Sequence, residues 1–130
     1  IINIASNAGL MGCPNRSPYV AAKWGVIGLT KTWAMELGPH KVRVNALCPA
    51  SVDGARIEAV MAHDAQERGI SVGEIRHSYE RQSSLQSFTR VEDIASMVCY
   101  LASDAGVRIS GQAIGLDGHT ETLGNSLGER

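Results

Sequence analysis

The sequence has no excess of either charge, since 12 basic and 13 acidic side chains give a formal net charge of -1 over 130 residues. That balance argues against a strongly basic nucleic-acid-binding protein. Charged residues make up 19% and hydrophobic residues 44% of the chain, which is ordinary for a globular protein and excludes general disorder. A chain of this length supplies one domain at most.

Long apolar runs and paired cysteines are also missing. Every apolar stretch is interrupted before the ~18 residues that a membrane span needs, so no membrane partner is predicted. Cys13, Cys48 and Cys99 form no CxxC pair, which argues against a disulfide framework or a zinc ribbon and indicates reduced cysteines in a cytoplasmic protein. The four histidines have no metal-ligand spacing, so no metal site is predicted.

The order of apolar and turn-forming residues predicts strands that alternate with helices. Residues 1–5 are rich in β-branched side chains and favour a buried parallel strand. Because chain termini usually lie at the surface, a chain that begins in such a strand is expected to be the C-terminal part of a longer protein. Residues 6–17 predict a loop, and Ser17-Pro18 predicts the N-cap and first position of a long helix that ends at Gly38-Pro39.

Residues 41–48 alternate apolar and polar side chains and predict a strand that Pro49 closes. Ser71 with Glu74, and Thr89 with Glu92, have the spacing of capping boxes that open two further helices. The remaining expected elements are helices over residues 55–68, 71–82 and 90–102, a strand over residues 112–117 and a flexible polar tail over residues 119–130.

Strands that alternate with helices predict a parallel sheet with right-handed crossovers. Gly25 and Gly28 lie inside the first long helix, where each costs about 1 kcal/mol relative to alanine. We therefore expect this helix to approach the sheet or a partner helix closely at these two positions.

Ligands of an open α/β sheet bind at the carboxyl ends of its strands, where Ser6, Tyr19 and Pro49 are expected. Tyr19 and Lys23 are four positions apart and therefore share one face of the helix. A phenol is a poor base at neutral pH, but a nearby ammonium favours its ionised form, so Tyr19 could exchange a proton with a substrate oxygen. Ser6 could donate a hydrogen bond to the same oxygen. Tyrosine and lysine at this spacing are common, so spacing alone favours an ordinary structural role.

Several segments in order make the pattern more specific, namely NIAS, a glycine-containing loop, SPYVAAKWGVIGLTKTWAMEL and VRVNALCPA. With Ser6 thirteen residues before Tyr19, and the tyrosine and lysine of YxxxK in phase, the sequence resembles the second half of the classical short-chain dehydrogenases/reductases. The resemblance continues through VEDIASMVCYLAS to ISGQAIGLDG. It implies an α/β, Rossmann-like doubly wound parallel sheet, of which residues 1–130 hold the C-terminal half: three strands with crossover helices.

The same resemblance implies that the dinucleotide-binding half of the domain precedes this chain. No GxGxxG or GxxxGxG pattern occurs here to bind a pyrophosphate. The residue that selects between NAD and NADP belongs to that other half, so both cofactors remain open.

In the family, hydride is transferred reversibly between a secondary alcohol or ketone and NAD or NADP. Ser6 matches the serine that orients the substrate oxygen, Tyr19 the general acid/base, and Lys23 the lysine that binds the nicotinamide ribose. Tyr19 and Lys23 would therefore contact the cofactor, together with Pro49, Ala50 and Val52 in the segment beside the nicotinamide.

Residues 55–82 match the variable helices that cover the substrate as a lid. Ala50 stands where the family usually has glycine, which would cost about 1 kcal/mol if the backbone needs a positive φ. Gly54 stands near the place of a threonine that often contacts the cofactor. His119 either approaches the site from the tail or lies at the surface.

The substrate remains open among 3-oxoacyl thioesters, sugars or polyols, and small hydroxy compounds. The alternative function is a non-catalytic fragment or interaction module derived from such an enzyme. Family resemblance also implies a homo-oligomer, a dimer or tetramer, that pairs through the helix of Tyr19 and through the last helix and strand.

Overall fold

The computed structural model describes residues 1–123 of the chain. Its helices, 3-10 turns and strands are β1 (Ile2–Ile4), η1 (Asn7–Gly9), α1 (Ser17–Leu37), η2 (Gly38–His40), β2 (Asn45–Pro49), α2 (Ala55–Arg68), α3 (Val72–Glu80), α4 (Val91–Ala102), η3 (Asp104–Gly106) and β3 (Ala113–Leu116). The part of the predicted flexible tail from residue 124 onward lies outside the described residues.

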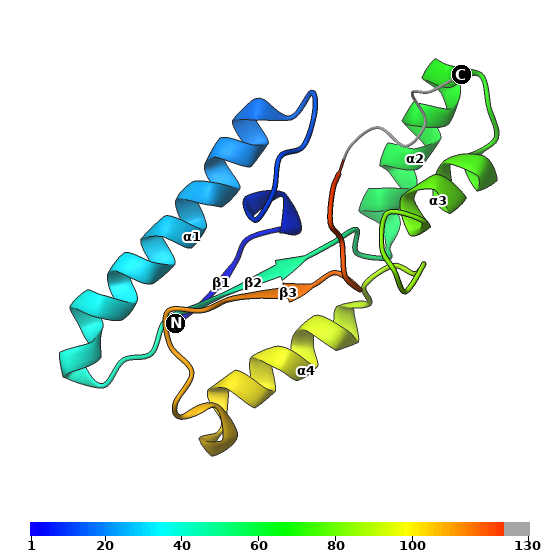
Figure 1. Cartoon of the computed structure of the whole chain (residues 1–130). Helices are drawn as coiled ribbons and strands as arrows, with labels where there is room; N and C mark the ends of the chain where they lie inside the picture. The colour runs from blue at the N-terminus through cyan, green and yellow to red at the C-terminus, as the bar shows by residue number, and fades with distance from the viewer. Residues whose placement is uncertain (124–130) are drawn as a thin grey trace.

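The three strands form one parallel sheet in the order β1-β2-β3, and Leu47 pairs with Ile4 on one side and Ile114 on the other. Helix α1 lies on one side of the sheet and α4 on the other, while α2 and α3 lie beyond the carboxyl ends of the strands (Figure 1). Helices on both faces of a parallel sheet define the doubly wound α/β class. The predicted fold class is confirmed.

Strand β2 is central and every one of its five residues is buried. Ala46 and Cys48 pack with Ala5 and Ile27 in a core between the sheet and α1. The predicted start of this strand at residue 41 is wrong, because Lys41 has a φ of 61° and ends the preceding turn. The backbone joins the sheet only at residue 45.

Strand β1 lies at the edge of the sheet in this chain. It pairs only with β2, so the side chains of Ile1 and Ile4 are 52% and 50% exposed. The predicted parallel strand is confirmed, and its side chains are exposed because the second side of β1 has no partner strand within residues 1–123.

Two predicted helix starts are wrong by one residue, and one is confirmed. Helix α1 has Arg16 as its N-cap and Ser17 inside the first turn. Helix α4 begins after Arg90, whose N–H donates to the Asp93 carboxylate at 2.9 Å, because Thr89 is used elsewhere. The capping box of Ser71 and its partner three residues on is present at α3.

All three cysteines are free, as predicted. Cys48 lies in the core between the sheet and α1, and this burial raises the pKa of its thiol. Within residues 1–123, no helix is long and apolar enough to cross a membrane.

Candidate functional site

An open cavity of about 730 Å³ lies at the carboxyl ends of the strands. Residues from β1, the start of α1, the segment after β2 and the α2–α3 pair line it. The six residues predicted for the site all belong to this lining: Ser6, Tyr19, Lys23, Pro49, Ala50 and Val52. The structure therefore brings together every predicted site residue in one cavity.

Ser6 lies at the point where β1 ends and η1 begins. Its side chain is buried, and its Oγ accepts a hydrogen bond from the Ala8 N–H at 3.2 Å. The same hydroxyl donates to Oδ1 of Asn7 at 3.3 Å. These two contacts hold the serine in one orientation at the cavity wall.

Tyr19 and Lys23 lie on consecutive turns at the beginning of α1. The Lys23 ammonium lies 5.6 Å from the centroid of the Tyr19 ring, and it donates a hydrogen bond to the Ile4 carbonyl at 3.2 Å. Lys23 thus connects the helix to the end of β1. Tyr19 is 39% exposed, so its hydroxyl is accessible from the cavity.

Gly9 is the position of close approach to α1, rather than Gly25 and Gly28. A Cβ at Gly9 would lie 2.9 Å from the Lys23 carbonyl oxygen and 2.9 Å from Cδ1 of Ile27. A Cβ at Gly25 or Gly28 would meet nothing within 4 Å. Of the two alternatives expected for those glycines, a close approach to the sheet is wrong. Gly9 in η1 is instead the residue that allows the turn after Ser6 to pack against the helix of Lys23.

Replacing Gly9 by alanine is expected to lower the free energy of unfolding by about 1–3 kcal/mol, because a backbone carbonyl cannot yield as a flexible side chain does. Urea unfolding of the 130-residue chain measures the change. Gly12→Ala is the matched control, since a Cβ there meets nothing within 4 Å. Equal stability of the two variants would show that the contact has no energetic weight.

The segment after β2 is held by two neighbours. The Ala50 N–H donates to the Leu116 carbonyl at 3.3 Å, and Thr89 pairs with this segment through its N–H to Ser51 (3.0 Å) and its carbonyl to the Asp53 N–H (2.9 Å). Ala50 does not have a positive φ, so its Cβ causes no strain there. Gly54, at the end of the segment, does have a positive φ of 146°.

The bridge between Val52 and Thr89 leaves the backbone N–H and C=O of Val52 unused. It uses the carbonyl of Ser51 and the N–H of Asp53, so the N–H and C=O of Val52 face away from Thr89. Within residues 1–123, neither group makes a hydrogen bond, and Val52 lines the cavity. A carboxamide carries both a donor and an acceptor, so it can bond to this free N–H and this free C=O at once.

The Thr89 hydroxyl fixes this arrangement by donating to the Leu116 carbonyl at 2.6 Å. Thr89→Val is expected to lower the free energy of unfolding by about 1–2 kcal/mol, because it removes a mostly buried hydrogen bond without changing the shape of the side chain. Urea unfolding is again the measurement. Thr32→Val removes an equivalent but exposed bond, Oγ1 to the Gly28 carbonyl, and serves as the control. Equal losses in both variants would contradict the role of Thr89.

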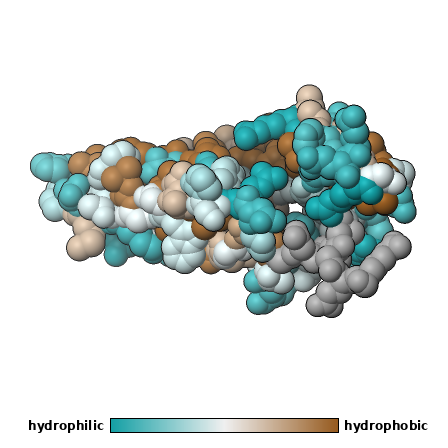
Figure 2. All heavy atoms as spheres, turned by 90° about the horizontal axis from the view of Figure 1, so that it is seen from above, coloured by the Kyte–Doolittle hydropathy of each residue, from teal (hydrophilic) through white to brown (hydrophobic). Residues whose placement is uncertain are grey.

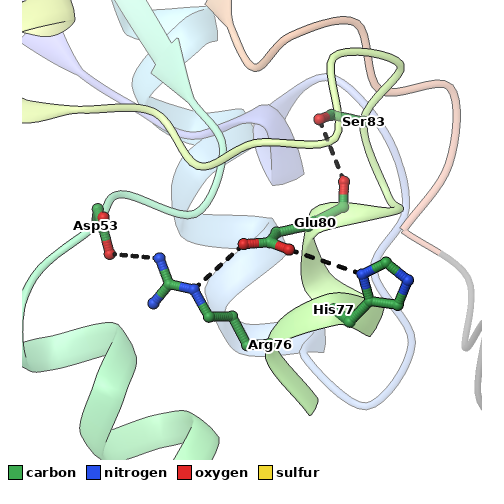
Figure 3. Close-up of polar contacts among 5 residues, drawn as sticks. All are labelled: Asp53, Arg76, His77, Glu80 and Ser83. Atoms are coloured by element: carbon green, nitrogen blue, oxygen red, sulfur yellow. Dashed lines mark hydrogen bonds and ion pairs between the residues drawn. The ribbon is translucent and has the colours of Figure 1, made fainter. Parts of the chain in front are cut away.

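Helices α2 and α3 have their own small core, separate from the core under the sheet. Met61, Ala65 and Ile75 are buried there. The pair is also tied to the segment after β2, because Nη2 of Arg76 lies 3.2 Å from Oδ1 of Asp53 (Figure 3). These contacts place a helical cover beside the cavity.

Arg76 joins several groups of this cover. Its Nε lies 3.2 Å from one carboxylate oxygen of Glu80, and the other carboxylate oxygen lies 3.8 Å from Nδ1 of His77 (Figure 3). The Ser83 hydroxyl donates to the backbone carbonyl of Glu80 at 3.4 Å. The guanidinium also lies 4.6 Å from the centroid of the Phe88 ring. Hydrogen bonding to Asp53 raises the pKa of Arg76 above its usual value.

Sequence reasoning missed Gly9, Thr89 and Arg76, because each acts through a contact with a distant part of the chain. His119, left open between two roles, does not line the cavity. Its Nδ1 lies 2.7 Å from the Ser84 hydroxyl and its Nε2 2.8 Å from Glu121. It therefore connects the segment after β3 to the connection that follows α3.

Three potential metal ligands that the sequence did not single out lie close together on α2. His63, Asp64 and Glu67 on α2 place one ligand atom each within 4.8 Å of the others. The Asp64 carboxylate, however, already accepts the Tyr79 hydroxyl at 2.9 Å, and His63 and Glu67 are exposed. An exposed set of this kind does not define a metal centre.

A cavity at the carboxyl ends of the strands is where doubly wound α/β proteins bind their ligands. Residues 1–119 match the family model described as Enoyl-(Acyl carrier protein) reductase. The chain belongs to this family, the short-chain dehydrogenases/reductases. The resemblance noted from the sequence is confirmed.

Individual relatives agree with the family. The D-beta-hydroxybutyrate dehydrogenase of Rhizobium meliloti (strain 1021) is 40% identical over 119 residues, which cover 91% of this chain and 46% of that protein. A short chain dehydrogenase family protein of Francisella tularensis superposes with a TM-score of 0.87 at 29% identity, covering 91% of this chain and 49% of the other.

Actinorhodin polyketide ketoreductase, solved with NADPH, superposes with a TM-score of 0.84 at 31% identity. The match covers 96% of this chain and 47% of that one. The chain thus spans about half the length of the proteins that it matches.

Proposed function

We propose that this chain supplies the catalytic half of an NAD- or NADP-dependent oxidoreductase that interconverts a secondary alcohol and a ketone. The observation that carries the proposal is that Ser6, Tyr19 and Lys23 line one cavity with the segment after β2. The chain spans about half the length of its relatives. We therefore assign the activity to a longer polypeptide that contains this chain and has the length of those relatives, and we call it the family-length enzyme.

Tyr19 is the proposed general acid/base. Its hydroxyl gives a proton to the substrate oxygen during reduction and removes one during oxidation. The Lys23 ammonium lies 5.6 Å from the ring centroid and places a positive charge beside the reacting group. Ser6 donates a hydrogen bond to the same substrate oxygen and fixes its position.

The free backbone N–H and C=O of Val52 fit the carboxamide of a nicotinamide, and Pro49 and Ala50 form the wall next to them. When bound, the nicotinamide supplies or accepts the hydride. Lys23 would hold the ribose of the same cofactor. Gly54 offers no side chain there, so the hydroxyl contact that a threonine often gives in the family is absent at this position.

Residues 55–82 are the proposed lid of the substrate site. Their helices enclose a core of their own, and the contact between Asp53 and Arg76 ties them to the cofactor segment. A lid attached in this way excludes water from the reacting atoms. The dehydrogenase and ketoreductase activities in the names of the relatives support reduction of a ketone or oxidation of an alcohol.

The alternative is a non-catalytic interaction module, and a cofactor titration separates the two functions. NADH and NADPH are added to the 130-residue chain while the fluorescence of Trp24 and Trp33 is followed. Saturable binding supports the oxidoreductase half. Absence of binding, both in the chain and in the family-length enzyme, would contradict the proposal.

We also propose that the family-length enzyme is a homo-oligomer that pairs through α1. Gly25 and Gly28 present open space on this helix, and Trp24 and Met35 are 52% and 80% exposed. Hydrophobic surface is visible along the part of the molecule away from α2 and α3 (Figure 2). Light scattering is expected to give the mass of a dimer or tetramer, and a monomer would contradict the proposal.

A further inference from the structure

The cavity carries positive charge that the described part of the chain does not neutralise. Three arginines line it, Arg16 before α1 and Arg56 and Arg68 at the two ends of α2. Within residues 1–123, none of the three guanidinium groups makes an ion pair or a hydrogen bond. The chain as a whole has a net charge of -1, so this excess of positive charge is local to the cavity.

The two acidic residues of the lining are already engaged. Asp53 lies 3.2 Å from Arg76, which is outside the lining. Asp64 accepts the hydroxyl of Tyr79 at 2.9 Å. Neither carboxylate is therefore paired with one of the three lining arginines.

Arg16 and Arg68 line the same cavity as Tyr79, a side chain of α3 that packs against the core shared by α2 and α3. Burial, with the hydrogen bond to Asp64, raises the pKa of the Tyr79 phenol, and the charges of Arg16 and Arg68 oppose that rise. Arg56 lies elsewhere, because about 18 Å of helix at 1.5 Å per residue separates it from Arg68.

We propose that Arg16 and Arg68 bind an anionic group of the substrate, a carboxylate or a phosphate, in the cavity that Tyr19 also lines. This inference rests on the proposed function and narrows its substrate class to hydroxy or oxo acids and phosphate esters. Arg16 comes from the loop before Tyr19 and Arg68 from the last turn of α2. An anion bound between them joins the catalytic helix to the lid.

The chemistry favours an anion over a neutral acyl group. A guanidinium presents a planar set of donors that matches a carboxylate or phosphate, and such charge-assisted bonds are stronger than neutral ones. Arg16 and Arg68 are both exposed, so each guanidinium is open to an incoming anion, whereas a neutral group at the same place would gain no charge-assisted bond. The Asp64 carboxylate already accepts the Tyr79 hydroxyl, so an anionic substrate would find no unpaired carboxylate on this wall of the cavity.

Chemical modification tests the site without any need for turnover. Phenylglyoxal is added to the 130-residue chain, and mass spectrometry follows each arginine in the presence of succinate, inorganic phosphate or neutral succinamide at matched ionic strength. Succinate or phosphate is expected to slow modification of Arg16 and Arg68 by about fivefold when present well above its Kd. Succinamide should not, and the more effective anion identifies the group.

Arg108 is the internal control, since it is exposed and does not line the cavity. Equal rates at Arg16 and Arg68 with and without both anions would overturn the inference. So would equal slowing of Arg108, which would show a general salt effect.

Kinetics of the family-length enzyme give a second test. The Arg16→Gln, Arg68→Gln double variant is expected to lose about 10- to 100-fold in kcat/KM for a hydroxy acid or phosphate ester. It should keep its rate with the matching neutral methyl ester, and Arg108→Gln should leave both unchanged. Equal losses for acid and ester would contradict an anion site. Turnover of the ester alone by the unmodified enzyme would overturn the anion site while leaving the proposed oxidoreductase intact.

Discussion

Replacement of Tyr19 by phenylalanine is expected to lower kcat of the family-length enzyme by about 10²- to 10⁴-fold, the range that positioned acid–base groups contribute. The change removes the phenol oxygen, which faces the cavity, and keeps the ring near Lys23. Binding of NADH or NADPH should therefore persist, since the ring and its neighbours are retained. Steady-state turnover and a cofactor titration measure the two quantities separately.

Tyr100→Phe is the matched control. Tyr100 lies on α4, is 48% exposed and does not line the cavity, so the variant should keep its full activity. A Tyr19→Phe enzyme with near-normal kcat would refute the acid–base assignment. Loss of cofactor binding together with kcat would instead show that the substitution disturbs the fold of the site.

Lys23→Met is expected to lower kcat/KM by about 10²- to 10³-fold, because it removes the charge beside the Tyr19 ring with little change in side-chain length. The variant also loses the hydrogen bond to the Ile4 carbonyl. Steady-state kinetics with both substrates varied should show a higher KM for the cofactor as well as a lower kcat, since Lys23 would hold the ribose.

Lys31 offers a control on the same helix. It also donates to a backbone carbonyl, that of Gly111 at 3.3 Å, but it does not line the cavity. Lys31→Met should leave kcat/KM within about twofold of the original, as expected for a surface substitution away from the site. Similar losses in the Lys23 and Lys31 variants would mean that Lys23 acts only through its backbone contact.

Strands and helices that are marked by neighbouring residues in the sequence are predicted well. The apolar run at residues 1–5, the proline near the start of α1 and the Ser71 capping box each correspond to an observed strand or helix end. Element boundaries are less predictable. The positive φ of Lys41 moves the start of β2 further along the chain, and the Thr89 hydroxyl donates to Leu116 in β3 instead of capping α4.

The site depends on contacts that no local pattern contains. Ser6 and Lys23 come close because Gly9 lets the chain rest on α1, and the glycines that the sequence singled out, Gly25 and Gly28, face open space. Thr89 holds Ser51 and Asp53 across nearly forty intervening residues. Spacing alone did not separate Tyr19 and Lys23 from an ordinary helical pair, and only the combined pattern identified the family.

Transfer of deuterium is the most direct test of the central claim. The family-length enzyme is given ketones and NADH or NADPH deuterated at the reactive nicotinamide carbon, and mass spectrometry locates the label in the alcohol. The proposed site predicts label on the carbinol carbon, with transfer that falls sharply in the Tyr19→Phe variant. Alcohol formed without label, or equal transfer by the variant, would contradict the account.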